Sequence, residues 1–243
     1  MSTLLKKALG GLALSVALAG GALADPVTLG DLAGGATIRA GDKLFDQWSY
    51  SFVSSDGRTF NPLNVTVDPL HDGGLDPGPG LDFSVLGGAL SVTGDGVYAF
   101  VDLSISFHVT VMDPALWVKD NLLSITDAGM GLAVDGSNDL GMYIRETVGT
   151  APGLDDLGAK WVEWSVLDDS DFMRLDDTAE FAPQRDIWIT KNILVWAVDP
   201  TDSANLAGFL QRYSQTRDVP EPDALALLAL ALASLALTRR RRR

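Results

Sequence analysis

The sequence predicts an all-β protein: an antiparallel β-sandwich of jelly-roll or Ig-like type, flanked by an N-terminal signal helix and a single short C-terminal transmembrane helix. Apolar residues recur at every second position in several runs. Turn-forming stretches such as "SSDGR" and "TGDG" separate these runs, and little of the chain shows helical periodicity. We expect three parts: a signal peptide at residues 1–24, a sandwich domain at 25–217 and a C-terminal tail at 218–243.

The stretch from Val97 to Met112 has the strongest strand pattern. Its odd positions are apolar, from Val97 to Val111, whereas polar residues such as Asp102 and His108 occupy the even positions. A period of two indicates a strand with one buried face. Because the stretch is longer than a usual strand, we expect a bend, a bulge or a crossing between sheets.

Shorter runs of the same kind predict further strands. In the run from Asp186 to Val198, apolar residues occupy both faces, so both should be covered. Between the two ends of the chain, we expect helix only at Ser203–Gln211. The remaining predicted strands are Gln47–Val53, Asn64–Val67, Leu81–Leu86, Asn121–Thr126, Gly131–Val134, Gly141–Val148 and Lys160–Leu167.

Composition narrows the classes of partner. The 243 residues suffice for one domain with a substantial core. The net charge is −14, and the lysines and arginines at the two ends leave the body still more acidic, which argues against nucleic acid as a partner. The chain has no cysteine, so disulfides and thiolate metal sites are excluded.

The N-terminus has the order of a secretory signal peptide. Lys6 and Lys7 precede an apolar stretch at 8–21, and Ala22 and Ala24 form an A-x-A cleavage site. We therefore expect export by the general secretion machinery and cleavage by signal peptidase after Ala24.

The C-terminus has a short apolar segment followed by a basic cluster. As a helix, Ala224–Leu237 would span about 21 Å, against a bilayer core of about 30 Å. Insertion of this segment should therefore be marginal. The positive-inside rule keeps the terminal arginines cytoplasmic and the body outside. This cluster consists of Arg239, Arg240, Arg241, Arg242 and Arg243.

The three residues Pro220, Glu221 and Pro222 stand directly before this segment, and the two prolines favour an extended chain that a protease can accept. Together with the apolar helix and the arginines, they resemble the PEP-CTERM sorting signal of Gram-negative bacteria that make exopolysaccharide. The resemblance implies that an exosortase, an integral membrane protease, holds the tail and cuts near the motif. It also implies transient anchoring in the inner membrane, followed by placement at the cell surface or in the extracellular matrix.

Catalytic motifs are absent from the sequence. No G-x-S-x-G, H-E-x-x-H, Walker or dinucleotide fingerprint occurs. His71 lies in a loop and His108 on a polar strand face, while Glu146 and Glu163 form one of many carboxylate pairs that could serve glycoside hydrolysis. We expect no catalytic residues and a non-enzymatic protein.

Calcium is the one cofactor that the sequence brings into consideration. The stretch "DGSNDLGMYIRE" places oxygen ligands at the first, third, fifth and twelfth positions of an EF-like loop. These residues are Asp135, Ser137, Asp139 and Glu146. Leu140 stands where that loop requires glycine. A second acidic stretch, at 168–177, is a further candidate.

These observations favour a structural or adhesion protein of the cell surface or matrix, associated with exopolysaccharide or biofilm. Two alternatives remain open: a calcium-dependent carbohydrate-binding module and a secreted hydrolase. Sugar binding would use some of the six tryptophans. Trp161 and Trp164 should point to opposite faces of one strand, so that one of them packs in the core.

Overall fold

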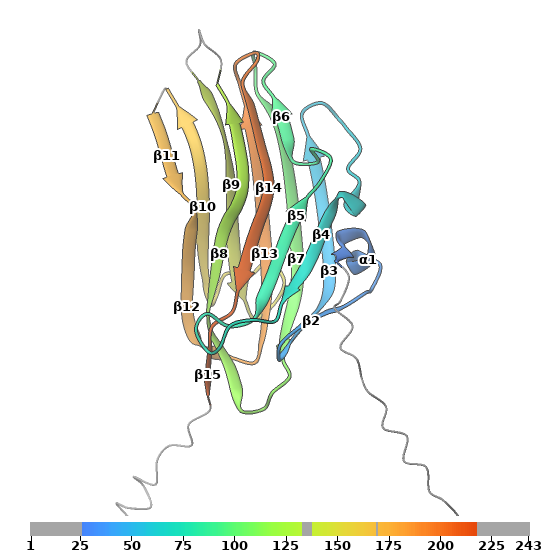
Figure 1. Cartoon of the computed structure of the whole chain (residues 1–243), viewed down its shortest axis with the longest axis vertical. Coiled ribbons are helices and arrows are strands. Elements are labelled where there is room, and N and C mark those ends of the chain that lie inside the picture. The colour runs from blue at the N-terminus through green and yellow to red at the C-terminus, as the bar shows by residue number, and fades with distance from the viewer. Residues whose placement is uncertain (1–25, 133–137, 169, 218–243) are drawn as a thin grey trace, which may run out of the picture.

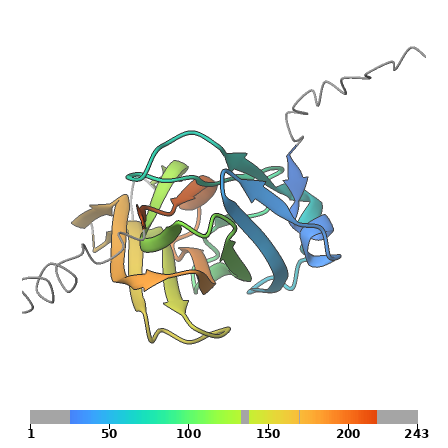
Figure 2. The same ribbon diagram turned by 90° about the horizontal axis from the view of Figure 1, so that it is seen from below.

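The computed structural model describes residues 26–132, 138–168 and 170–217, and these residues form two antiparallel β-sheets packed face to face (Figure 1). Seen from below, the two sheets form separate layers (Figure 2). The predicted β-sandwich is thereby confirmed. The predicted signal helix, its cleavage site and the C-terminal helix lie outside the described residues. Within the described ranges, no helix has the length and apolar character needed to cross a membrane.

One sheet has seven strands in the order β11-β10-β9-β13-β7-β3-β2, and every neighbouring pair is antiparallel. The strands are β2 (Ile38–Ala40), β3 (Lys43–Ser54), β7 (Ala99–Val111), β9 (Asp139–Gly149), β10 (Gly158–Leu167), β11 (Ser170–Arg174) and β13 (Asp186–Ala197).

The other sheet has eight strands. Six follow the order β1-β4-β5-β14-β8-β12, while β6 pairs with β14 and β15 pairs with β8. The strands are β1 (Val27–Thr28), β4 (Val65–Leu70), β5 (Gly80–Val85), β6 (Ser91–Thr93), β8 (Leu116–Gly131), β12 (Asp176–Gln184), β14 (Ser203–Arg212) and β15 (Gln215–Arg217). A short helix, α1 (Leu29–Ala33), and a 3₁₀ turn, η1 (Pro62–Asn64), accompany them.

Strand β7 lies in the middle of the seven-stranded sheet and confirms the period-two prediction. Its odd residues from Ala99 to Val111 are buried, whereas the even ones are half-buried. Val97, which the pattern also assigned to the buried face, precedes the strand and is exposed. The bulge expected within this stretch is absent from its pairing with β13, which is continuous from Ala99 to Thr110. A bulge lies instead in the neighbouring strand β3: Asp46 pairs with His108 and Ser49 with Ser106, so β3 carries one extra residue.

This bulge delivers an aromatic side chain to the core between the sheets. Gln47, inside the bulge, has a φ of 53°, and Trp48 after it is buried. The Trp48 ring stacks on Phe107 of β7 at 4.3 Å and lies 6.3 Å from Phe83 of the opposite sheet. Phe83 in turn stacks on Phe209 at 4.5 Å. Contacts between aromatic rings thus cross the interface between the two sheets.

The helix expected at Ser203–Gln211 was wrong, because these residues belong to β14. The pairing of β14 with β8 shifts register around Gly208. Because of this irregularity, Leu206 and Phe209 are both buried although they are three positions apart, and this spacing resembles a helical pattern.

Two further strand predictions differ from the structure. The strand expected at Asn121–Thr126 lies inside β8, which runs without a break from Leu116 to Gly131. Of the strand expected at Gly131–Val134, only the first residue belongs to β8, and residues 133–134 lie outside the described residues. The acidic stretch at 168–177, expected as a turn or a metal loop, contains all of β11 and the start of β12. Strands at a sheet edge can carry polar residues on both sides, and periodicity does not find them.

We expect Trp48→Ala to lower the free energy of unfolding by about 3–5 kcal/mol, because the substitution empties the space between Phe107 and Phe83. Urea denaturation followed by circular dichroism measures this loss. Val97→Ala is the matched control: Val97 is 78% exposed, and its change should stay within about 0.5 kcal/mol. Equal losses in both variants would contradict the assignment of Trp48 to the core.

Candidate functional site: a buried charge network

Three charged side chains lie side by side on the inner face of the seven-stranded sheet. Lys160 of β10 pairs directly with Glu146 of β9, and Glu146 pairs directly with Lys191 of β13. Residues paired in this way project to the same face with their Cβ atoms only a few ångströms apart. The register alone therefore places one carboxylate between two lysines.

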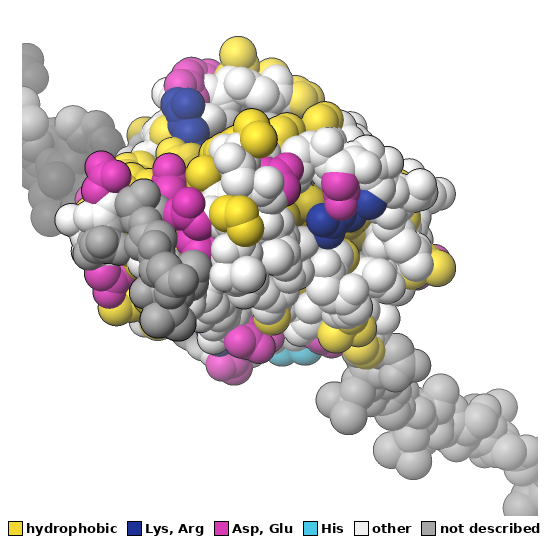
Figure 3. Space-filling model, turned by 90° about the horizontal axis from the view of Figure 1, so that it is seen from above, with side chains coloured by type: hydrophobic (Ala, Val, Ile, Leu, Met, Phe, Trp, Pro, Cys, Tyr) yellow, Lys and Arg dark blue, Asp and Glu magenta, His cyan; other side chains and the backbone are white. Residues whose placement is uncertain are grey.

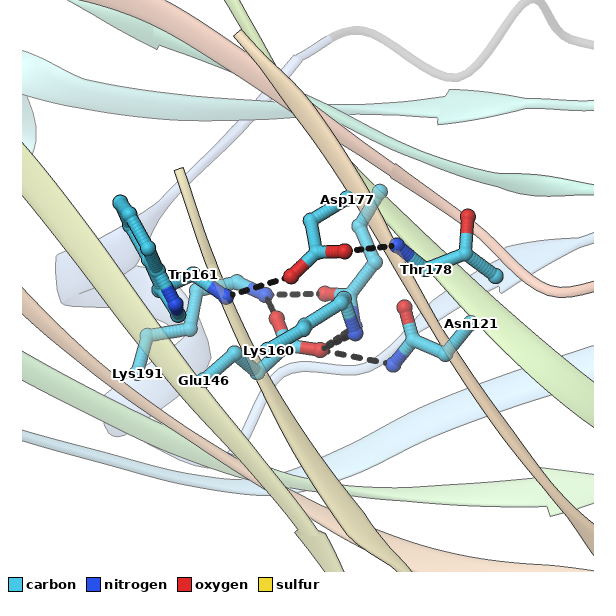
Figure 4. A network of polar contacts seen from close by, with 8 residues as sticks. Asn121, Glu146, Lys160, Trp161, Asp177, Thr178 and Lys191 are labelled. Carbon is cyan, nitrogen blue, oxygen red and sulfur yellow. Dashed lines mark hydrogen bonds and ion pairs between the residues drawn. The ribbon is translucent and has the colours of Figure 1, made fainter. Parts of the chain in front are cut away.

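Two amide side chains from the opposite sheet complete the network, and Figure 4 labels one of them, Asn121. Asn121 of β8 donates through Nδ2 to Glu146 Oε1 at 2.8 Å, and Gln211 of β14 donates through Nε2 to the same oxygen at 2.8 Å. Lys160 Nζ donates to Oε1 at 2.5 Å, while Lys191 Nζ donates to Oε2 and to the Gln211 side-chain oxygen. Glu146 thus receives donors from both sheets.

The network is sealed from solvent. The side chains of Glu146, Lys160 and Lys191 have no exposed surface. Asn121 and Gln211 are also buried. A substrate outside the protein cannot reach these groups without opening the sandwich.

Burial has a strong effect on both lysines. It lowers the pKa of Lys160 well below its ordinary value, although the negative charges of Asp177 and Asp120 oppose this change. Burial also lowers the pKa of Lys191 well below its ordinary value. A single carboxylate balances only one ammonium group, so the site favours a neutral amine at one of the two lysines.

Aromatic rings lie near Lys191, whereas a further carboxylate lies on the side of Lys160. Lys191 Nζ lies 5.6 Å from the ring centre of Phe107 and 5.9 Å from that of Phe83, within reach of a cation–π interaction. On the side of Lys160, Asp177 accepts hydrogen bonds from the backbone N–H groups of Trp161 and Thr178 at 3.0 and 2.9 Å. These two bonds are also drawn in Figure 4.

This network was missed in the sequence prediction. The available signal was a polar residue at an inward position of an apolar alternation, as in β13, where Lys191 stands between Ile189 and Ile193. Glu146 interrupts β9 in the same way. Each interruption alone is ambiguous, and only the strand register brings the charges together.

Two members of the EF-like calcium set lie far apart in the structure. Asp139 and Glu146 are seven residues apart on the continuous strand β9, so their side chains point to opposite faces and their backbones are separated by about 23 Å. Asp139 accepts a hydrogen bond from the Trp196 indole at 3.1 Å, and Glu146 is in the buried network. Asp135 and Ser137 lie outside the described residues.

The candidate catalytic residues do not form a shared site either. Glu146 faces inward, whereas Glu163 of β10 lies three residues from the inward-facing Lys160 and faces outward, so the two carboxylates cannot flank one sugar bond. His108 Nδ1 lies 3.1 Å from Asp46 Oδ1 on the outer sheet face. His71 Nδ1 accepts a hydrogen bond from the backbone of Gly41.

Tryptophan side chains occupy both faces of β10, as expected. Trp164 packs against the core, while Trp161 lies on the outer face, where Arg174 stacks over its ring at 4.6 Å and Phe172 lies beside it at 5.7 Å. Neighbouring protein groups therefore already contact the Trp161 ring.

A pocket of about 270 Å³ lies near the end of the sandwich opposite β15. Figure 3 views this end, where acidic and apolar side chains are intermixed and basic side chains occur in only a few places. The pocket is lined by Met130, Leu132, Asn138, Trp164, Val166 and Asp171. It combines an indole with polar groups, as ligand sites often do.

The fold places this chain among the two-sheet antiparallel β-sandwich proteins. Similar solved structures include the enzymatically active domain of bacteriophage CBA120 tailspike protein 4, with 11% identity and a TM-score of 0.25 over 67% of this chain and 19% of that chain. A carbohydrate-binding module with specific mannan recognition has 13% identity and a TM-score of 0.24, over 79% and 97% of the two chains. Endoglucanase 3 of Trichoderma harzianum, from family GH12, has 5% identity and a TM-score of 0.24, over 69% and 98%. Similarity at this level assigns no function.

The C-terminal tail gives a more specific result. The PEP-CTERM protein-sorting motif matches residues 218–243, which confirms the signal predicted from Pro220, Glu221, Pro222 and the terminal arginines. Such a motif implies an exported protein that an exosortase sorts. No curated protein matches the chain.

We expect Lys191→Met to lower the free energy of unfolding by about 3–5 kcal/mol, because it leaves the buried Glu146 carboxylate and the Gln211 oxygen without this donor. Lys119→Ala is the control, since Lys119 pairs with Asp76 at 3.0 Å on the surface and should contribute at most about 1 kcal/mol. Chemical denaturation of both variants measures the difference. A loss at Lys191 no larger than that at Lys119 would show that the network adds little to stability.

Proposed function

We propose that this protein is a non-enzymatic structural or adhesion component of the cell surface or extracellular matrix, delivered by an exosortase-type system and associated with exopolysaccharide. The sorting motif at 218–243 is the observation that carries this proposal. The acidic body suits neutral polymers and cations better than nucleic acid.

The interior of the sandwich supports a structural role. Titratable groups with perturbed pKa values often mark an active site when they line a cleft. Here the two lysines with the lowered pKa values lie between the sheets with no exposed surface. Their position favours a role in holding the sheets together over one in turning over an external substrate.

Delivery would proceed in three steps. The signal peptide directs export, after which the apolar segment at 224–237 holds the tail in the membrane while the terminal arginines stay inside. The exosortase then cuts near Pro220–Pro222, where the prolines keep the chain extended.

Replacing all five residues Arg239–Arg243 by alanine should leave the chain unprocessed or mislocalised, because the tail loses the charges that hold it in the membrane. Fractionation of the native host, with intact mass of the recovered protein, measures this effect. Arg217→Ala, which removes an exposed basic residue before the motif, should be processed normally. Normal processing of the five-alanine variant would contradict the proposed mechanism.

Carbohydrate binding is a second candidate, favoured by the pocket that contains Trp164, Asn138 and Asp171. An indole offers a flat apolar face for a sugar ring, and the neighbouring polar side chains offer hydrogen bonds. Calcium could assist only through residues other than the EF-like set.

If this pocket binds sugar, Trp164→Ala should weaken retention on the host polysaccharide by about tenfold or more. Affinity electrophoresis with and without a calcium chelator measures both the binding and its dependence on the metal. Trp188→Ala, on the outer face of β13, is the control. A wild-type protein that the polysaccharide does not retard would exclude this candidate.

A further inference from the structure

The buried network brings an amine, a side-chain amide and a carboxylate together without access to water. Lys160 Nζ and Asn121 Nδ2 donate to the same oxygen, Glu146 Oε1, at 2.5 and 2.8 Å. Lys160 belongs to β10 of one sheet and Asn121 to β8 of the other. A bond between these two side chains would therefore join the sheets covalently.

We propose that Lys160 and Asn121 form an intramolecular isopeptide bond, with Glu146 as the catalytic group that transfers the proton. The lysine nitrogen attacks Cγ of Asn121, and a bond forms between Nζ and Cγ. The bond between Cγ and Nδ2 breaks, and Nδ2 leaves as ammonia. The reaction needs no oxidant, reductant or other co-reactant.

The position of Glu146 suits both halves of this proton transfer. Its Oε1 atom contacts the nitrogen that must lose a proton and also the nitrogen that must gain one. General acid–base catalysis requires contact of this kind. Because the folded sheets hold all three side chains in place, the reaction is unimolecular and has a high effective concentration of reactants.

The surroundings activate the amine. Only a neutral lysine is a nucleophile, and burial lowers the pKa of Lys160 well below its ordinary value. The Asn121 Oδ1 atom is buried and has no hydrogen-bond partner among the described residues, so no donor restrains this amide through its oxygen. A buried oxygen without a partner is rare in a folded protein.

The second amine–amide pair in the network is held by a different contact. Lys191 Nζ donates to the Gln211 side-chain oxygen, a bond that is strongest for the protonated amine. Lys191 also bonds the other carboxylate oxygen, Oε2, and lies near two aromatic rings that favour its charged form. These contacts favour Lys191 as the counter-ion of Glu146 and Lys160 as the nucleophile, although Asp177 and Asp120 oppose the lowering of the Lys160 pKa.

Such a bond has a clear physical value in this protein. The chain has no cysteine, so disulfides cannot stabilise the exported body. An amide between β8 and β10 would restrict the unfolded chain as a disulfide does, and it would also resist reduction. The inference concerns the body alone and stands independently of the sorting route and of any ligand.

Mass spectrometry of the wild-type full chain tests the proposal directly. The linked protein should be lighter than its sequence by the mass of one ammonia. Trypsin should yield residues 120–145 joined to residues 146–174, because acylated Lys160 is no longer a cleavage site. Recovery of separate peptides 120–145, 146–160 and 161–174 would overturn the proposal, and so would a link between Lys191 and Gln211.

Variants test the role of each group. Glu146→Gln, Asn121→Ala and Lys160→Met should all lose the joined peptide and retain the ammonia. The surface control Lys119→Ala should keep the link, with residues 59–145 joined to residues 146–174 because the cleavage site at 119 is gone. Circular dichroism checks that each variant folds. A joined peptide that persists in folded Glu146→Gln would overturn the assignment of Glu146 as the proton carrier.

Discussion

The carboxylate of Glu146 is the constraint on which the interior of the sandwich depends. A charge in a dry core is costly unless opposite charges and hydrogen bonds surround it. Lys160 and Lys191 come from the strands on either side, and Asn121 and Gln211 come from the opposite sheet. The carboxylate can be satisfied only when both sheets are in register and correctly opposed, so it contributes to the specificity of the fold as well as to its stability.

The remainder of the core accommodates this polar centre with large apolar side chains. Phe83 and Phe107 approach Lys191 from opposite sheets, and Trp48 stacks on Phe107. The bulge in β3 supplies Trp48 without disturbing the pairing of β7 with β13. The strands that hold the buried charged network in register therefore also carry the aromatic packing of the core.

The sequence predicted those features correctly that are encoded within one continuous stretch of chain. The alternation in β7 and the PEP-CTERM tail both lie within one stretch of chain, and both were predicted correctly. β14 was missed because the irregularity at Gly208 interrupts its alternation. The network was missed for a different reason: Glu146, Lys160 and Lys191 become neighbours only through strand pairing, which no single stretch encodes.

The position of β15 has a consequence for how the molecule is presented. This strand pairs with β8 at the lower end of the sandwich in Figure 1, and the described chain ends there. If the domain is tethered through its C-terminus, the end that carries β15 would lie next to the point of attachment. Its opposite tip, with the Trp164 pocket, would then be the part that reaches farthest into the surroundings of the cell.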